Sequence, residues 1–214
     1  MDTVVQWNIR GLRSNFEELK LLLNRSQSAV VALQECRLGE GQLPPQGYTL
    51  LLAQVGSLGA RRPFSSEIVL NTGLHAAAAT ISMEKRFLSV PASQYPSFET
   101  LCLAELFEQL PKPFLVLGDF NAFSCREGRE RMLEQFMAEN DLIILNSGEQ
   151  TFVYSAYHST SAIDLIVASP SIAAECSWAV HSDLCGSDHF PIFLTLFSSF
   201  NSNVNPSFNF QKAV

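Results

Sequence analysis

The sequence has little charge and no long hydrophobic run. Asp, Glu, Lys and Arg make up only 16% of its 214 residues, whereas hydrophobic residues make up 47%. This composition excludes an intrinsically disordered chain and predicts a large core. No apolar stretch approaches the roughly 18 to 20 residues of a membrane-spanning helix, and residues 1–3 lack the basic start of a signal peptide. We therefore expect an intracellular protein, in the nucleus or the cytoplasm, with no membrane partner.

The sequence also has few cysteines and a deficit of basic residues. Its five cysteines form an odd set with no Cys-x-x-Cys spacing, which argues against a disulfide framework and a zinc cage. With 14 basic and 21 acidic residues, the formal net charge is −7, which disfavours nonspecific nucleic-acid binding through overall charge. A metal-dependent nuclease remains compatible with this balance, because a cation screens the phosphate from the carboxylates of the site.

Apolar runs of strand length alternate with helical patterns early in the chain, and strand-like runs dominate later. Residues 16–23 have helical spacing, and Ser14 precedes Glu17 at the spacing of a capping box, which predicts a helix start. Residues 56–66 are loop-like by their Gly, Ser and Pro content. This order predicts a mixed α/β layered fold in one domain, residues 1–197, followed by a linker-like tail at residues 198–214.

Polar side chains stand where several apolar runs end, and the ends of strands at one sheet edge are common places for functional sites. Each of these residues alone also fits a structural explanation, such as a cap, a surface residue or a turn. Asp164 differs because it lies inside an apolar run, where a buried carboxylate needs an arginine or a histidine as its partner. The polar residues at the other run ends are Asn8, Glu35, Asp119, Asn121, Asp188 and His189.

Five segments in this order resemble the motifs of the endonuclease/exonuclease/phosphatase superfamily: Gln6-Trp7-Asn8, Gln34-Glu35, Gly118-Asp119-Phe120-Asn121, Ser161-Ala162-Ile163-Asp164 and Ser187-Asp188-His189. Within that superfamily, Trp-Asn-Ile-Arg-Gly-Leu, Thr151-Phe152 and Ser-Asp-His-Phe-Pro-Ile are similar to the endonuclease domain of arthropod LINE (non-LTR) retrotransposons. The resemblance implies a DNase I-like sandwich of two mixed β-sheets flanked by helices. It also implies DNA as substrate and, in a full-length element, a C-terminal reverse transcriptase that these residues do not include.

The resemblance implies a metal ion and an activated water. Asn8 and Glu35 would bind Mg²⁺ or Mn²⁺, and Asp188 would supply a further oxygen near the metal. Such hard oxygen ligands suit these cations and argue against zinc. Asp119, helped by Asn121, would orient and deprotonate the water.

The remaining motif residues would act on the phosphate. By resemblance, His189 contacts a phosphate oxygen, while Asp164 fixes the tautomer of the ring and favours its charged form. Thr151 and Ser187 would donate hydrogen bonds to phosphate oxygens.

The sequence departs from the family pattern in three places. A glycine-containing strand is expected after residues 57–63, and a Ser-x-Tyr-x-Pro strand is expected where residues 86–91 contain no tyrosine and Tyr95 comes late. Residues 122–126 lack the usual histidine and Trp-Gly turn. We therefore expect a fold that lacks one or two strands and a degenerate copy with weak or no activity. The other interpretation is that these are natural short loops.

Three functions compete. The leading interpretation is a divalent-metal-dependent endonuclease that nicks target DNA for retrotransposition. The second is a phosphatase or phosphodiesterase of the same fold, against which the retroelement-like contexts of Asn8 and Asp188 weigh. The third is a non-catalytic retroelement remnant or binding module.

Overall fold

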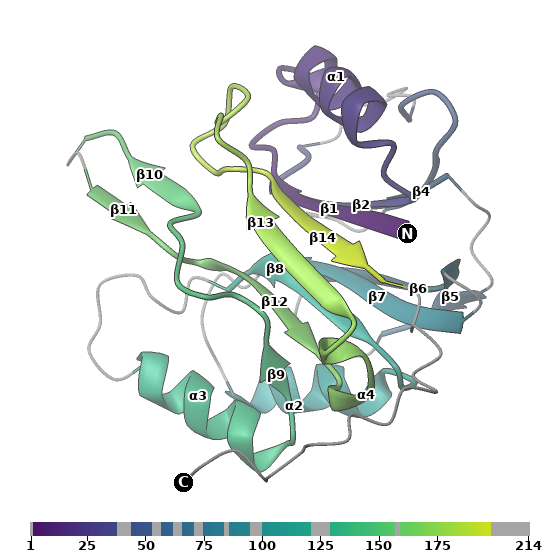
Figure 1. Cartoon of the computed structure of the whole chain (residues 1–214), viewed down its shortest axis with the longest axis vertical. Helices are drawn as coiled ribbons and strands as arrows, with labels where there is room; N and C mark the ends of the chain where they lie inside the picture. The colour runs from purple at the N-terminus through teal and green to yellow at the C-terminus, as the bar shows by residue number, and fades with distance from the viewer. Residues whose placement is uncertain are drawn as a thin grey trace, which may run out of the picture.

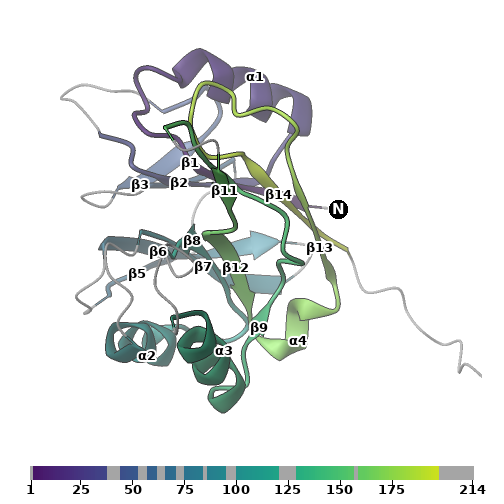
Figure 2. The ribbon, with the colours of Figure 1, turned by 90° about the vertical axis from the view of Figure 1, so that its left-hand side faces the viewer.

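The computed structural model describes residues 2–37, 44–52, 57–61, 66–70, 75–83, 86–94, 100–120, 129–156 and 159–197. Two six-stranded sheets lie face to face, with helices on both outer sides (Figures 1 and 2). The expected layered sandwich of two mixed sheets is therefore confirmed. The predicted tail at residues 198–214 lies outside the described residues. Within the described ranges, no helix is long and apolar enough to cross a membrane.

The first sheet has the strand order β13-β14-β1-β2-β4-β3, in which only β1 and β2 are parallel. On one face of β1, Val5 and Trp7 pack with Leu19 of α1 (Phe16–Ser26), and on the other Val4 packs into the core between the sheets. Burial on both faces explains why the strand is a continuous apolar run. The strands are β1 (Asp2–Asn8), β2 (Val30–Gln34), β3 (Thr49–Leu52), β4 (Ser57–Ala60), β13 (Cys176–Val180) and β14 (Ile192–Leu196).

The second sheet has the order β5-β6-β7-β8-β12-β9, in which only β7 and β8 are parallel. Apolar residues of α2 (Thr100–Gln109) and α3 (Arg129–Glu139) pack on its outer face around Phe114 and Val116. Full burial of each such large side chain stabilises the fold by about 1.5 to 3 kcal/mol. The strands are β5 (Ser66–Ile68), β6 (His75–Met83), β7 (Arg86–Gln94), β8 (Leu115–Asp119), β12 (Asp164–Ala168) and β9 (Ile143–Ile144), and a short helix, α4 (Pro170–Ala173), follows β12.

A separate two-stranded hairpin extends from one end of the sandwich (Figure 1). It consists of β10 (Phe152–Tyr154) and β11 (Ser159–Ser161), which pair in antiparallel register. An isolated bridge links Phe152 to His189, so the base of the hairpin lies beside the Ser-Asp-His motif.

The prediction of a loop at residues 56–66 is wrong for residues 57–60, whereas the expected loss of a strand after residue 63 stays a prediction. Residues 57–60, predicted as loop, form β4, which contains Gly59 and pairs with both β2 and β3. β7 continues three residues beyond Pro91 to Gln94, so Tyr95 directly follows the end of a strand, after Ser93 at the Ser-x-Tyr spacing. Tyr95 itself lies outside the described residues, as do residues 121–128.

The first helix begins where the sequence predicts, but its capping box does not form. Asn15 is the N-cap residue and makes no side-chain capping hydrogen bond. The hydroxyl of Ser14 donates instead to the carbonyl of Gly11, at 2.8 Å. The polar side chain therefore stabilises the loop after β1 and not the helix terminus.

Candidate active site

The polar residues at the strand ends come together at one end of the sandwich. In the first sheet, Asn8 ends β1 and pairs in register with Gln34, the residue before Glu35. In the second sheet, Asp119 ends β8 and lies opposite Asp164, the first residue of β12. The chain between β13 and β14 adds Ser187, Asp188 and His189.

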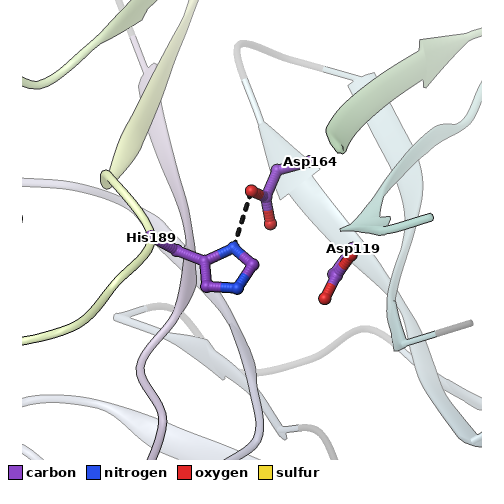
Figure 3. Close-up of side chains that lie close together, drawn as sticks. All are labelled: Asp119, Asp164 and His189. Atoms are coloured by element: carbon purple, nitrogen blue, oxygen red, sulfur yellow. Dashed lines mark hydrogen bonds and ion pairs between the residues drawn. The ribbon is translucent and has the colours of Figure 1, made fainter. Parts of the chain in front are cut away.

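Asp119, Asp164 and His189 form a buried group, which we call the acid–histidine cluster. Figure 3 shows their side chains pointing toward one another. The Nδ1 atom of His189 lies 2.8 Å from Oδ2 of Asp164, and both side chains are almost fully buried. The partner of the buried carboxylate is therefore the histidine, which is the functional one of the two alternatives, and not an arginine.

The pKa of His189 is raised from 6.5 to about 9. Burial alone would lower it, but the charge of Asp164, its hydrogen bond to the ring and the charges of Asp119 and Asp188 together outweigh burial. The ring is therefore charged at neutral pH. Because Nδ1 bonds to Asp164, the Nε2 atom is the one left to meet a substrate.

The raised pKa predicts that stability depends on pH. A group whose pKa is higher in the folded state stabilises the fold fully below its unfolded value, and this contribution disappears as pH rises toward the folded value. For His189 the window is pH 6.5 to about 9. We expect the free energy of unfolding to fall by roughly 3 kcal/mol across it. Urea unfolding at a series of pH values should show this fall in the native chain and little of it in Asp164→Asn. Equal falls in both proteins would contradict the pairing.

Asn8 connects the two sheets within the site. Its Nδ2 atom lies 3.2 Å from Oε1 of Glu35 and 3.2 Å from Oδ2 of Asp119. Two residues earlier in β1, Gln6 donates from Nε2 to the carbonyl oxygen of Gly118 at 2.9 Å. Gly118 is the residue before Asp119. These bonds hold carboxylates of the first and second sheets at a fixed separation. No role was predicted for Gln6, although a polar residue inside the apolar run of residues 4–7 is a signal in the sequence, and the side chain is fully buried.

Glu35 and Asp188 each pair with an arginine for which no role was predicted. Arg37 contacts Oε2 of Glu35 at 3.1 Å, and Arg10 pairs with Oδ2 of Asp188. These four residues line a cavity of about 250 Å³, whose other lining residues are Asp119, Phe152, Tyr154, Ile163 and His189. The cavity has both acidic and basic walls, as a site for a cation and an anion requires.

The two predicted phosphate-binding hydroxyls make backbone hydrogen bonds. Thr151 is fully buried, and its hydroxyl accepts from the N–H groups of Ile163 and Asp164, both at 3.1 Å. The hydroxyl of Ser187 donates to the carbonyl of Asn8 at 2.7 Å. Both residues fix segments of the site, and their contact with phosphate stays a prediction. Asn121 lies outside the described residues.

Two sets of side chains have the chemistry to hold a metal ion. The ligand atoms of the acid–histidine cluster lie within 4.8 Å of one another, but one carboxylate oxygen and Nδ1 of that cluster already bond to each other. Asn8, Glu35 and Asp188 supply oxygen ligands only. Oδ1 of Asp188 is buried without a hydrogen-bond partner in the described part of the chain. This oxygen set fits a hard divalent cation.

The sequence matches known mobile-element proteins. Residues 90–193 match the family described as Endonuclease-reverse transcriptase. The chain is 28% identical over 217 residues to the RNA-directed DNA polymerase from mobile element jockey of Drosophila melanogaster, covering 89% of the chain. It is 30% identical over 215 residues to the protein of the same name from Drosophila funebris, again covering 89% of the chain. The matched region is only 23% of the length of each relative.

Solved structures share the fold over almost their whole length. The endonuclease domain of TRAS1, a telomere-specific non-LTR retrotransposon, has a TM-score of 0.70 at 17% identity, covering 92% of this chain and 98% of that chain. The 3′ phosphatase NExo from Neisseria, bound to product DNA hairpin, has a TM-score of 0.73 at 17% identity, covering 92% and 99%. Sequence and fold agree: the chain is similar to non-LTR retrotransposon proteins in sequence, and it shares the DNase I-like fold of the endonucleases and phosphatases among these structures.

Proposed function

We propose that the chain is a divalent-metal-dependent endonuclease that nicks one strand of DNA. The observation that carries this proposal is the meeting of the acid–histidine cluster with Asn8 and Glu35 at one end of the two sheets. A nick with a free 3′-hydroxyl would supply the primer for a reverse transcriptase in a longer element. The RNA-directed DNA polymerases that the chain matches support this context.

Asp119 is the proposed general base, with Asn121 helping to hold the water. It accepts a proton from a water molecule, whose oxygen attacks the scissile phosphorus while the bond to the 3′ oxygen breaks. The departing 3′ oxygen takes a proton from solvent water, so the products are a 3′-hydroxyl and a 5′-phosphate. The hydrogen bond from Asn8 fixes Oδ2 of Asp119, which sets the direction from which the water attacks.

His189 is the proposed phosphate ligand. Its charged ring directs Nε2–H toward a non-bridging oxygen and stabilises the charge that develops there in the transition state. Asp164 holds the ring through Nδ1 and keeps it charged. Thr151 supports this pair because its hydroxyl bonds the backbone N–H of Asp164 itself.

Asn8, Glu35 and Asp188 are the proposed ligands of Mg²⁺ or Mn²⁺. When bound, the cation would neutralise charge on the scissile phosphate and on the leaving oxygen. The carboxylate of Glu35 lies in the cavity wall beside Asp119, so this ligand is close to the proposed base.

Residues 86–91 contain no tyrosine to contact the phosphate, which still predicts weak activity, whereas β4 and β7 are both present. We therefore expect nicking that is slow but measurable. The purified chain with Mg²⁺ should convert supercoiled plasmid to open circles, and 3′-end extension by a polymerase should detect the new hydroxyl. Cleavage of only a 3′-phosphate or a phospholipid headgroup would support the phosphatase or phosphodiesterase alternative. No turnover of any of these substrates, with DNA binding retained, would support a non-catalytic module.

A further inference from the structure

Arg10 lines the cavity of the proposed active site, and hydrogen bonds hold the backbone around it. It follows β1 by two residues, and its φ angle of 51° lies in the left-handed region, which is uncommon for a residue with a side chain. Its own N–H bonds Oδ1 of Asn8 at 3.3 Å. The next residues are tied to the loop after β2, because Gly11 donates to the carbonyl of Glu35 at 2.8 Å and Leu12 to that of Cys36 at 2.7 Å. Such backbone conformations persist where surrounding contacts impose them, and they concentrate at functional sites.

The charge balance of the cavity calls for a cation that can meet an anionic substrate. Glu35, Asp119 and Asp188 all line the cavity, and the whole chain has a formal net charge of −7. Among the described residues that line it, the basic side chains are those of Arg10, Arg37 and His189. Phosphates approaching this site therefore meet strong repulsion unless these side chains, or a bound metal ion, offset it.

The guanidinium of Arg10 is oriented but not enclosed. Its Nη1 atom pairs with Oδ2 of Asp188, and 54% of its side-chain surface is exposed. A guanidinium has five N–H donors in a planar fork, so a single carboxylate contact leaves donors for a second anion. Asp188 is the more buried partner, with 18% of its side chain exposed, and can act as the fixed support. Arg37 is less constrained, because its partner Glu35 lies only two residues away and 65% of its side chain is exposed.

We propose that Arg10 is a substrate-binding residue that contacts a backbone phosphate of DNA, with Asp188 orienting its guanidinium. The inference rests on the proposed function for the identity of the substrate. It assigns Asp188 a second task besides its proposed place near the metal. A planar fork held by one carboxylate favours a phosphate in a defined direction, so Arg10 helps to align the strand relative to Asp119 and His189.

The test measures binding without cleavage. Fluorescence anisotropy of a labelled DNA duplex in EDTA gives the dissociation constant of the complete chain at several KCl concentrations. Arg10→Ala should weaken binding roughly fivefold to tenfold and reduce the slope of log K against log salt by about 0.9, the value for one lost phosphate contact. Arg10→Lys should keep most of the slope, because the charge remains. The matched control is Arg131→Ala, an exposed arginine of α3, which should leave both quantities unchanged.

The outcomes separate the two proposals. A native chain that binds DNA with the same salt slope as Arg10→Ala would overturn the role of Arg10 and leave the proposed endonuclease intact. Equal losses in Arg10→Ala and Arg131→Ala would also overturn it, because the effect would then be one of overall charge. A native chain that binds no DNA in EDTA but nicks plasmid with Mg²⁺ would overturn this inference alone. A native chain that neither binds DNA nor nicks plasmid with Mg²⁺ would overturn the proposed function and, with it, this inference.

Discussion

Replacing Asp119 with asparagine should lower the rate of plasmid nicking at least about a hundredfold, since a positioned general base typically contributes a factor of 10² to 10⁴. The substitution keeps the shape of the side chain and an oxygen that can accept from Asn8. It removes only the capacity to take a proton from water. His189→Ala should produce a loss of similar size, because a donor to the developing phosphate charge is worth about 10² to 10³ in rate. Initial rates of open-circle formation at saturating Mg²⁺ measure both effects.

A suitable control is Glu139→Gln, which neutralises an exposed carboxylate at the end of α3, in a different part of the fold. It should leave the rate unchanged. Circular dichroism should show that Asp119→Asn remains folded, because the backbone pairing of β8 with β12 does not depend on the side-chain charge. Near-native nicking by both Asp119→Asn and His189→Ala would remove these residues from the mechanism.

Strands buried on both faces were predictable from the sequence, and strands with mixed composition were not. β1, β2 and β8 are nearly continuous apolar runs because helices cover one face of their sheets and the opposite sheet covers the other. β4, with the sequence Ser-Leu-Gly-Ala, has no such pattern. Its position is set by pairing with β2 on one side and β3 on the other. Pairing between distant segments produces no pattern in the local sequence, so it could not be predicted.

β7 occupies the residues where the sequence predicted a strand without its tyrosine, and it continues beyond Pro91 to Gln94. Pro91 argues against a central strand, since proline cannot donate to the ladder. In the structure, however, the pairing of β7 with β8 begins only at Ala92, so Pro91 lies before the part of the strand that has neighbours on both sides. Because β7 ends at Gln94, Tyr95 is the next residue in the sequence after a strand that pairs with β8.

The side chains of the site were predictable as a set, but their connections were not. The sequence indicated which strand ends carry polar residues. It also indicated that Asp164 needs a specific partner. The hydrogen bond from Gln6 to Gly118 joins residues 112 positions apart, and the ion pair of Arg10 with Asp188 joins residues 178 positions apart. Spacing rules predict contacts only between residues close in the sequence. The capping box failed for a local reason, because the hydroxyl of Ser14 donates to the carbonyl of Gly11 in the loop after β1.

Removing divalent metal should abolish nicking, and Glu35→Gln should weaken metal binding more than tenfold. Changes to groups that merely orient metal ligands typically lower affinity 10- to 100-fold, so loss of a charged ligand should exceed the lower limit of that range. Glutamine keeps an acceptor oxygen for Asn8, so the network around the site should remain folded. Isothermal titration with Mn²⁺ measures affinity independently of cleavage, with Glu139→Gln as the matched loss of one carboxylate.

The metal prediction is contradicted if EDTA-treated protein nicks at the native rate, or if Mn²⁺ binds Glu35→Gln as tightly as it binds the native chain. In the second case, the ligand atoms of the acid–histidine cluster would be the next set to test, because they too lie close together. Asp164→Asn would then weaken metal binding, whereas a metal held by Glu35 should bind that variant with little change. The pair of variants thus identifies which carboxylates hold the cation, since Glu35 follows β2 of the first sheet and Asp164 begins β12 of the second.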